Sequence, residues 1–228
     1  MQICHHKHST LTLETDDRFF VFDWYDSHEP NLPAGKKSVF IATHGHGDHF
    51  HPAVLGMGEH DTLFILSDDI PVPEETDRRV TRIRPDETYE IEGYTVTTFG
   101  STDQGVSVLL EGADLSFFFA GDLNAWIWEN DDEETQEMER SDYLRELEKI
   151  MKHTLDIACV PADPRLGPNF DEGVRLFYDA CRPNHIVPLH FQADYSVPKK
   201  LKMMYPTLPI IVYSKSDECK DPHKAESR

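Results

Sequence analysis

Short runs of apolar residues, separated by glycine, aspartate and proline, recur along the first half of the chain. Leu11 and Leu13 alternate with polar neighbours, the pair 16–17 marks a turn, and the apolar run 18–22 follows as a hairpin partner. A short helix is expected to begin at Pro52. Further strands are predicted at 38–43, 62–66, 79–84, 94–99, 105–110 and 115–120. The first half of the chain is therefore predicted to be rich in β-structure.

From residue 129 onward the spacing of apolar residues becomes helical. The segment 129–148 carries ten acidic and two basic side chains. Within it Met138, Leu144 and Leu147 fall on one helical face, so a helix is predicted from about 132 to 153 with its acidic face in solvent. The remaining predicted elements are strands at 155–160, 184–189 and 209–213 and a helix at 170–181.

The order of these elements, strands first and then strands alternating with helices, indicates the fold class. It predicts an α/β or α+β fold in which two sheets pack together and helices cover them. A length of 228 residues suits one domain with a sizeable core. We therefore expect a single domain over 1–214, followed by a polar, flexible tail over 215–228.

The formal net charge of −20 narrows the classes of partner. An acidic surface disfavours binding to nucleic-acid backbones and to anionic membranes, which require basic patches. No stretch approaches the roughly 18 apolar residues of a membrane helix, and the N-terminus lacks the apolar region of a secretory signal. A small-molecule substrate is the expected partner, with no nucleic acid and no membrane, and the oligomeric state is left open.

The four cysteines are widely spaced and form no Cys-x-x-Cys pair. Cys159 lies in a predicted apolar strand and Cys181 near a predicted helix end, where buried thiols are common. This usage predicts reduced cysteines and a cytoplasmic protein.

The segment 41–51 holds most of the candidate chemistry. It follows a predicted strand and crowds three imidazoles and a carboxylate into six residues, with glycines that let the chain bend tightly. These side chains are His44, His46, Asp48 and His49. Imidazole and carboxylate groups are common protein ligands of divalent metals. A chance cluster on a polar loop is the less favoured interpretation, and we predict a metal site.

The segment 44–49, His-x-His-x-Asp-His after a hydrophobic strand, resembles the signature of metallo-β-lactamase-fold hydrolases. Two later segments extend the resemblance. The strand that leads to Gly-Asp at Asp122 is similar to the family element whose aspartate bridges two metals, and the strand before His190 is similar to the one that delivers the last histidine ligand. The chain resembles a compact bacterial branch that includes L-ascorbate-6-phosphate lactonase. The resemblance implies a four-layer αββα sandwich with the metals at one edge.

The resemblance also implies a ligand for each metal ion. The implied ligands are His44 and His46 for the first ion, Asp48, His49 and His190 for the second, and Asp122 as a bridge between them. The implied cofactors are two divalent ions, zinc or manganese, with iron as an alternative. A metal-activated water is then the nucleophile, and Asp48 is the catalytic residue that orients it and moves its proton. No serine or cysteine nucleophile motif competes for this role.

One position departs from the family pattern. The family carries a histidine in the loop before the Gly-Asp element, whereas the loop 99–106 contains none and has Asp103 at the expected place. If Asp103 is a ligand, the first site is richer in oxygen, which shifts preference from zinc toward manganese or ferrous iron. If it points away, the first site lacks a ligand and Asp103 is a turn residue. We favour ligation by Asp103.

Further candidates surround the implied centre. Asp23, after an early strand, resembles the family aspartate that supports the metal loop, with an ordinary turn aspartate as the equal alternative. Candidates for substrate contact are Trp126, Trp128, Arg165 and Phe191, with core packing or a structural salt bridge as alternatives.

Several histidines outside the motif remain. His5, His6 and His8 form a dense cluster that could scavenge metal, and a position of His8 near the centre is the less favoured alternative. His51 is expected to line the pocket or face solvent rather than bind metal.

We therefore predict a metal-dependent hydrolase acting on a small ester, lactone, amide or phosphoester. One alternative is a mononuclear iron dioxygenase of the same fold, although such relatives keep the loop histidine that is missing here. The other is a non-catalytic metal-binding module, against which the joint presence of Asp48, His49, Asp122 and His190 argues.

Overall fold

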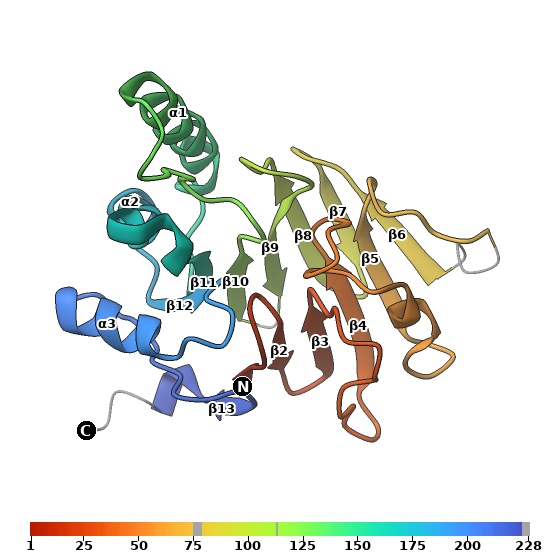
Figure 1. Cartoon of the computed structure of the whole chain (residues 1–228). Helices are drawn as coiled ribbons and strands as arrows, with labels where there is room; N and C mark the ends of the chain where they lie inside the picture. Colours follow the sequence, from red (N-terminus) through yellow and green to blue (C-terminus); the bar gives the residue numbers. More distant parts are fainter. Residues whose placement is uncertain (75–78, 113, 225–228) are drawn as a thin grey trace.

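The computed structural model describes residues 1–74, 79–112 and 114–224. Two β-sheets pack face to face, and helices cover the outer face of the second sheet (Figure 1). Within the described residues the first sheet has seven strands in the order β13-β1-β2-β3-β4-β5-β6, and the second has six in the order β12-β11-β10-β9-β8-β7.

Both sheets mix parallel and antiparallel pairs. The strands of the first sheet are β1 (Gln2–His5), β2 (Leu11–Glu14), β3 (Arg18–Phe22), β4 (Lys37–Ala42), β5 (Leu63–Ser67), β6 (Val80–Ile83) and β13 (Glu218–Lys220). Those of the second are β7 (Thr88–Ile91), β8 (Tyr94–Phe99), β9 (Ser107–Gly112), β10 (Leu115–Phe119), β11 (Ile157–Pro161) and β12 (His185–Leu189). The strands β3 to β6 are parallel to one another, and so are β10 to β12. Each sheet therefore has a parallel half whose carboxyl ends lie at one edge.

Alternating side chains divide the core into layers. In β3, Phe20 and Phe22 face the second sheet, whereas Phe19 and Val21 face outward. This is the two-residue period of a strand, and both faces are buried because both are covered. Burying each such aromatic or aliphatic side chain contributes about 1.5–3 kcal/mol.

Three α-helices pack on the outer face of the second sheet: α1 (Glu133–Ile150), α2 (Glu172–Cys181) and α3 (Ser196–Met204). The carboxylate of Asp132 accepts a hydrogen bond from Thr135 N and caps α1. No helix within the described residues is long and apolar enough to cross a membrane.

The outer face of the first sheet has a thinner cover. The 3₁₀-helix η1 (Pro52–Gly56) and the loop around Ile70 pack on Phe40 and Phe64 there. The predicted sandwich of two sheets with outer helices is confirmed, and its fourth layer consists of η1 and loops within the described residues.

Most predicted elements are confirmed, one is wrong, and the strands β1, β7 and β13 were not predicted. The helix predicted at 132–153 is α1. The strand predicted at 209–213 is wrong, because that segment contributes only the single bridge between Ile210 and Ile186. The helix α3 was not predicted, because it contains Pro198 and three lysines and its apolar face is too short to show a helical period.

The C-terminal segment returns to the first strand. β13 pairs antiparallel with β1, and a disulfide joins Cys4 to Cys219 across this pair. The expected flexible tail over 215–228 is therefore wrong at β13, and residues 225–228 lie outside the described residues. The expectation of reduced cysteines is also wrong for this pair, whereas Cys159 and Cys181 are free and buried. The cytoplasmic location stays a prediction. The cysteines Cys4 and Cys219 do not support it, because they form a disulfide.

Reduction of the Cys4–Cys219 disulfide should lower the free energy of unfolding by about 2–5 kcal/mol, because the bond links positions 215 residues apart. Urea unfolding with and without dithiothreitol measures the change. Cys4→Ser should show the same loss without reductant, and Cys181→Ser, which removes a free thiol, is the control for thiol loss. Equal stability of the oxidised and reduced protein would contradict this expectation.

Candidate metal centre

The candidate ligands gather where the carboxyl ends of parallel strands from both sheets meet. His44 follows β4, Asp122 follows β10, and His190 follows β12. Neighbouring parallel strands end at the same edge of a sheet, and their terminal loops form a common crevice there. Residues far apart in the sequence therefore reach one centre.

One group of candidate ligands consists of His44, His46 and Asp122, with donor atoms within 4.8 Å of one another. His44 is fully buried, and its Nδ1 lies 3.0 Å from Thr43 Oγ1. This contact leaves Nε2 facing Asp122 Oδ2, 3.5 Å away. His46 is more accessible, with 45% of its side chain exposed. In this group His44 and Asp122 are therefore buried, whereas the His46 side chain is partly exposed.

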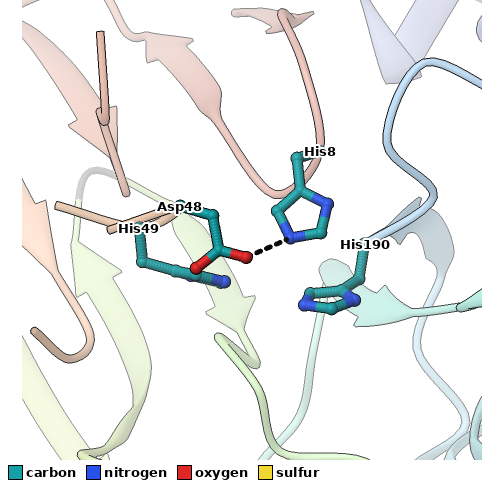
Figure 2. Close-up of side chains that lie close together, drawn as sticks. All are labelled: His8, Asp48, His49 and His190. Carbon is teal, nitrogen blue, oxygen red and sulfur yellow. Dashed lines mark ion pairs between the residues drawn. The ribbon is translucent and has the colours of Figure 1, made fainter. Parts of the chain in front are cut away.

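A second group consists of His8, Asp48, His49 and His190, again with donor atoms within 4.8 Å of one another. Figure 2 shows these four side chains pointing toward one another from three separate loops. His8, His49 and His190 are buried, whereas the Asp48 side chain is 51% exposed. The group offers three imidazoles and one carboxylate around a single point.

Asp122 lies between the two groups. Its Oδ1 is 3.1 Å from His49 Nε2 and 3.3 Å from His190 Nε2, and its Oδ2 is 3.5 Å from His44 Nε2. A carboxylate in this position can contact two ions at once, as the predicted bridging ligand must.

Asp23 supports the loop after β4. Its carboxylate accepts hydrogen bonds from Thr43 N and Thr43 Oγ1, both at 2.8 Å, and lies 2.7 Å from His49 Nδ1. Asp23 is fully buried. A carboxylate on the far nitrogen of a ligand histidine fixes the tautomer and orientation of the ring, so His49 presents Nε2 to the centre.

Asp163 does the same for His190. It follows β11, and its Oδ2 lies 2.9 Å from His190 Nδ1. The same carboxylate accepts hydrogen bonds from Arg165 Nε. Each of these two ligand histidines thus rests on a buried carboxylate from the neighbouring parallel strand.

The backbone at the centre is held in uncommon conformations. His8, Asp23 and His190 have φ angles of 51°, 46° and 61°, in the left-handed region. Such residues cost of order 1–3 kcal/mol each and persist where their surroundings determine them. Gly105 has a φ of 73°, and a Cβ there would lie 2.0 Å from Thr43 O. The loop with Asp103 can pack against the His44 loop only because this position is glycine.

Burial and neighbouring charges shift the pKa values of side chains at the centre. Burial raises the pKa of Asp122, but the facing His190 and His49 outweigh it and hold that pKa well below its usual range. Burial also opposes protonation of His49, yet Asp23 and Asp122 raise its pKa to about 10. Burial and His49 lower the pKa of His44. Ionised carboxylates are thus balanced by a proton on an imidazole, a charge pattern that a divalent cation can replace.

Several buried polar atoms at the centre make no hydrogen bond within the described residues. Within the described residues, the atoms His8 Nδ1, His8 Nε2, His44 Nε2, His49 Nε2 and Asp122 Oδ1 are buried without a hydrogen bond. Buried polar atoms are normally paired, so a cluster of unpaired ones requires an explanation. Imidazole nitrogens and carboxylate oxygens are the donors that zinc, manganese and iron accept. These residues therefore fit a divalent metal ion.

Asp103, the predicted substitute for the loop histidine, lies beside the first group rather than inside it. Its Oδ2 is 3.9 Å from His46 Nδ1, with both side chains 45% exposed. Its backbone N donates to Ser101 Oγ at 3.2 Å, as in a local turn. None of the three groups of converging candidate ligand atoms within the described residues includes it. Ligation by Asp103 stays a prediction.

Asp103→Ala should weaken metal binding at His44 and His46 by about 10–100-fold and leave the second group unchanged, because Asp103 is the carboxylate that faces His46 from the loop. Elemental analysis after gel filtration should show the loss of about one ion per chain. Unchanged stoichiometry would show that Asp103 is only a turn residue.

A pocket of about 400 Å³ opens over the centre. Three of the four predicted substrate contacts, Trp126, Trp128 and Arg165, line it together with ligands of both groups. Trp126 Nε1 donates to Asp122 O at 3.0 Å, so this indole also holds the Gly-Asp loop. The Arg165 guanidinium lies over the Trp128 ring, 5.9 Å from its centroid. One side of the pocket is thus lined by two indole rings and by the positively charged guanidinium of Arg165.

Two expectations about the pocket need correction. Phe191 is fully buried and stacks on His5 at 4.7 Å, so it is a core residue and not a wall for substrate. Glu139 of α1 lines the pocket, although the whole acidic face of this helix was expected in solvent. Burial raises the pKa of Glu139 most, and nearby carboxylates, chiefly Asp142, raise that pKa further.

Two residues at the centre were underestimated. His8 was the less favoured candidate, and Asp163 was not singled out. Asp163, like Asp23, is a carboxylate in the loop that follows a predicted strand. The sequence therefore contains the same indication for both residues. His51 belongs to none of the groups of candidate ligands within the described residues. It caps η1, because its Nδ1 accepts a hydrogen bond from Ala53 N.

Known proteins resemble this chain in structure rather than in sequence. No protein-family model matches the sequence, and no curated protein matches it. Igni18, a metallo hydrolase from the hyperthermophilic archaeon Ignicoccus hospitalis, is 15% identical with a TM-score of 0.64, over 96% of this chain and 97% of that one. YhfI, a metallo-β-lactamase fold protein from Bacillus subtilis, is 13% identical with a TM-score of 0.59, over 96% and 98%.

A third similar structure is that of a hydroxylase. CmlA, a diiron β-hydroxylase from Streptomyces venezuelae, is 12% identical with a TM-score of 0.60, over 96% of this chain and 53% of that one. Taken together, these likenesses show that the chain has the metallo-β-lactamase fold, as the motifs predicted.

Proposed function

We propose that this chain is a metal-dependent hydrolase that binds two divalent metal ions. The position of Asp122 between two groups of histidine ligands carries the proposal, because it gives one carboxylate contacts to His44, His49 and His190. Zinc or manganese is the proposed metal, with iron as the alternative, since the donors are imidazoles and carboxylates.

The residues of the pocket suit the activation of water. When bound by these residues, a divalent metal would supply a water of lowered pKa and stabilise negative charge on a substrate oxygen. Asp48 lines the pocket with its side chain 51% exposed, so its carboxylate can orient a water and accept its proton. Asp23 and Asp163 keep His49 and His190 oriented throughout, because both carboxylates are fully buried.

The pocket favours a small substrate with an anionic or polar group. Its volume of about 400 Å³ suits a small molecule. Arg165 is oriented by Asp163 and lies over Trp128, so its guanidinium can bind a carboxylate or phosphate of the substrate. We propose a small ester, lactone, amide or phosphoester, since the net charge of −20 disfavours polyanionic partners such as nucleic acids and anionic membranes.

A second candidate function is oxygen-dependent iron chemistry. His44, His46 and Asp122 form a set of two histidines and one carboxylate, which in other proteins holds ferrous iron with open positions. CmlA shares the fold and is a diiron β-hydroxylase.

An assay under nitrogen separates the two candidates. Metal-free protein is reloaded with zinc, manganese or ferrous iron and offered small esters, lactones, amides and phosphoesters, first without oxygen and then in air. Hydrolysis by the zinc or manganese form supports the proposal, and Asp48→Asn should reduce it by about 10²–10⁴-fold. Asp16→Asn, at an exposed carboxylate, is the control. Turnover only with iron and oxygen would favour the oxygenase, and no turnover by any form would contradict both.

A further inference from the structure

A histidine outside all the metal-binding motifs lies within the second ligand group. His8, in the loop between β1 and β2, has 1% of its surface exposed. Its ring centroid is 3.9 Å from that of His190 and 5.5 Å from that of His49. Its Nε2 is 3.3 Å from Asp48 Oδ2, the contact drawn as a dashed line in Figure 2. The His8 ring therefore faces the same point as the three motif ligands.

Neither ring nitrogen of His8 makes a hydrogen bond among the described residues, and Nε2 has the 3.3 Å contact with Asp48 Oδ2 while Nδ1 is buried without a polar contact. A buried polar group left unpaired costs about 1–3 kcal/mol, so such groups are rare unless they serve a purpose. The neighbours of the ring are a carboxylate and two imidazoles, Asp48, His49 and His190, all of them potential metal ligands. A cation shared with these groups would supply the missing partner.

The backbone of His8 is fastened to the loop that carries His190. His8 N donates to Gln192 O at 3.0 Å, and His190 N donates to His8 O at 3.1 Å. The buried ring of His5 also contacts His8 O through Nε2 at 3.2 Å. These contacts hold His8 in a left-handed conformation with a φ of 51°. A strained residue fixed from three directions is typical of a functional position.

We infer that His8 is a protein ligand of the metal ion held by Asp48, His49 and His190. The inference rests on the proposed metal centre and adds to it a ligand from the N-terminal loop. With His8, the second group offers three imidazoles and a carboxylate, whereas the first group offers two imidazoles and a carboxylate.

The two sites should therefore differ in affinity. The loop 99–106 lacks the histidine that would complete the first group, and His8 adds an imidazole to the second. Nitrogen-rich sites bind zinc and cobalt more tightly than sites with fewer nitrogen donors. We expect the second site to fill first, and the first site to lose its ion first when a chelator is added.

Cobalt titration of metal-free, tag-free protein tests the inference. Visible absorption and elemental analysis should show two binding steps in the wild type. His8→Phe keeps a ring against His190 but removes both nitrogens, and it should weaken the tighter step by at least about 10-fold and change its absorption bands. The weaker step should be unchanged. His8→Gln is the second variant in case the phenyl ring disturbs folding.

His6→Gln is the matched control. His6 lies in the same loop, but its Nδ1 contacts Asp217 Oδ1 at 2.7 Å instead of the centre. Both cobalt steps of His6→Gln should equal those of the wild type. A loss equal to that of His8→Phe would show a general disturbance of the loop and overturn the inference.

Thermal melting distinguishes a ligand from a structural residue. As a ligand, His8 contributes to the rise in melting temperature on cobalt binding, so His8→Phe should reduce that rise without lowering the melting temperature of metal-free protein. A lower melting temperature of the metal-free variant with an unchanged rise would overturn the inference. X-ray absorption of the wild type with one equivalent of cobalt should show three imidazoles, and two would also overturn it. Wild-type protein that binds no cobalt would instead contradict the proposed metal centre itself.

Discussion

Asp122→Ala should remove nearly all bound metal and lower kcat/KM by at least about 10³-fold, which corresponds to about 4 kcal/mol of transition-state stabilisation. Its two oxygens lie 3.1–3.5 Å from the Nε2 atoms of His44, His49 and His190, so one substitution removes a carboxylate that faces histidines of both groups. The substitution also leaves three buried imidazoles close together without the carboxylate between them.

Elemental analysis and turnover of the hydrolysed substrate measure both effects of Asp122→Ala. Asp156→Ala is the matched control. Asp156 accepts hydrogen bonds from Ser116 N and Asn184 Nδ2 near the amino ends of β10 and β12, whereas the candidate metal centre lies at their carboxyl ends. It should lose some stability and keep its metal. Wild-type metal content in Asp122→Ala would exclude the bridging role.

Asp23→Ala should have the second-largest effect, although Asp23 does not face the pocket. It leaves Thr43 N and the protonated His49 buried without their carboxylate, so the free energy of unfolding of metal-free protein should fall by about 3–5 kcal/mol. Metal affinity should fall by about 10–100-fold, because the His49 ring loses the contact that fixes its orientation.

Urea unfolding and competition with a chelator measure the two effects of Asp23→Ala separately. Asp26→Ala, three residues along, removes a partly exposed carboxylate that contacts His28 and should change neither quantity appreciably. If Asp23→Ala kept wild-type metal affinity, the support of His49 by Asp23 would be unimportant for the centre.

The motif residues of the centre were predictable because their signal is local. His44, His46, Asp48 and His49 lie within six positions after one strand, and the strand itself is recognisable by its continuous apolar run. Asp122 and His190 were found because each also ends a buried strand. Parallel strands then bring these loops to one edge of the sandwich.

Residues that depend on contacts across the whole chain were harder to predict. His8 reaches the centre because its backbone bonds to Gln192 and His190, more than 180 residues away in the sequence. The Cys4–Cys219 bond depends in the same way on the pairing of β13 with β1. Phe191 illustrates the reverse error, since it is adjacent to a ligand in sequence but points into the core.

The support of ligand histidines follows one rule in both sheets. Asp23 follows β3 and contacts His49 after the parallel β4, and Asp163 follows β11 and contacts His190 after the parallel β12. A carboxylate at the end of one parallel strand is therefore within reach of a histidine after the next. This pattern can be sought in a sequence once the strand order is known.

Metal content of protein purified without a histidine tag, after growth with added zinc or manganese, tests the central claim most directly. We expect about two ions per chain in the wild type, as a centre bridged by one carboxylate requires. The same preparation of Asp122→Ala should be nearly metal-free. Wild-type protein without stoichiometric metal under both conditions, or with the same content as Asp122→Ala, would contradict a metal centre at His44, Asp122 and His190.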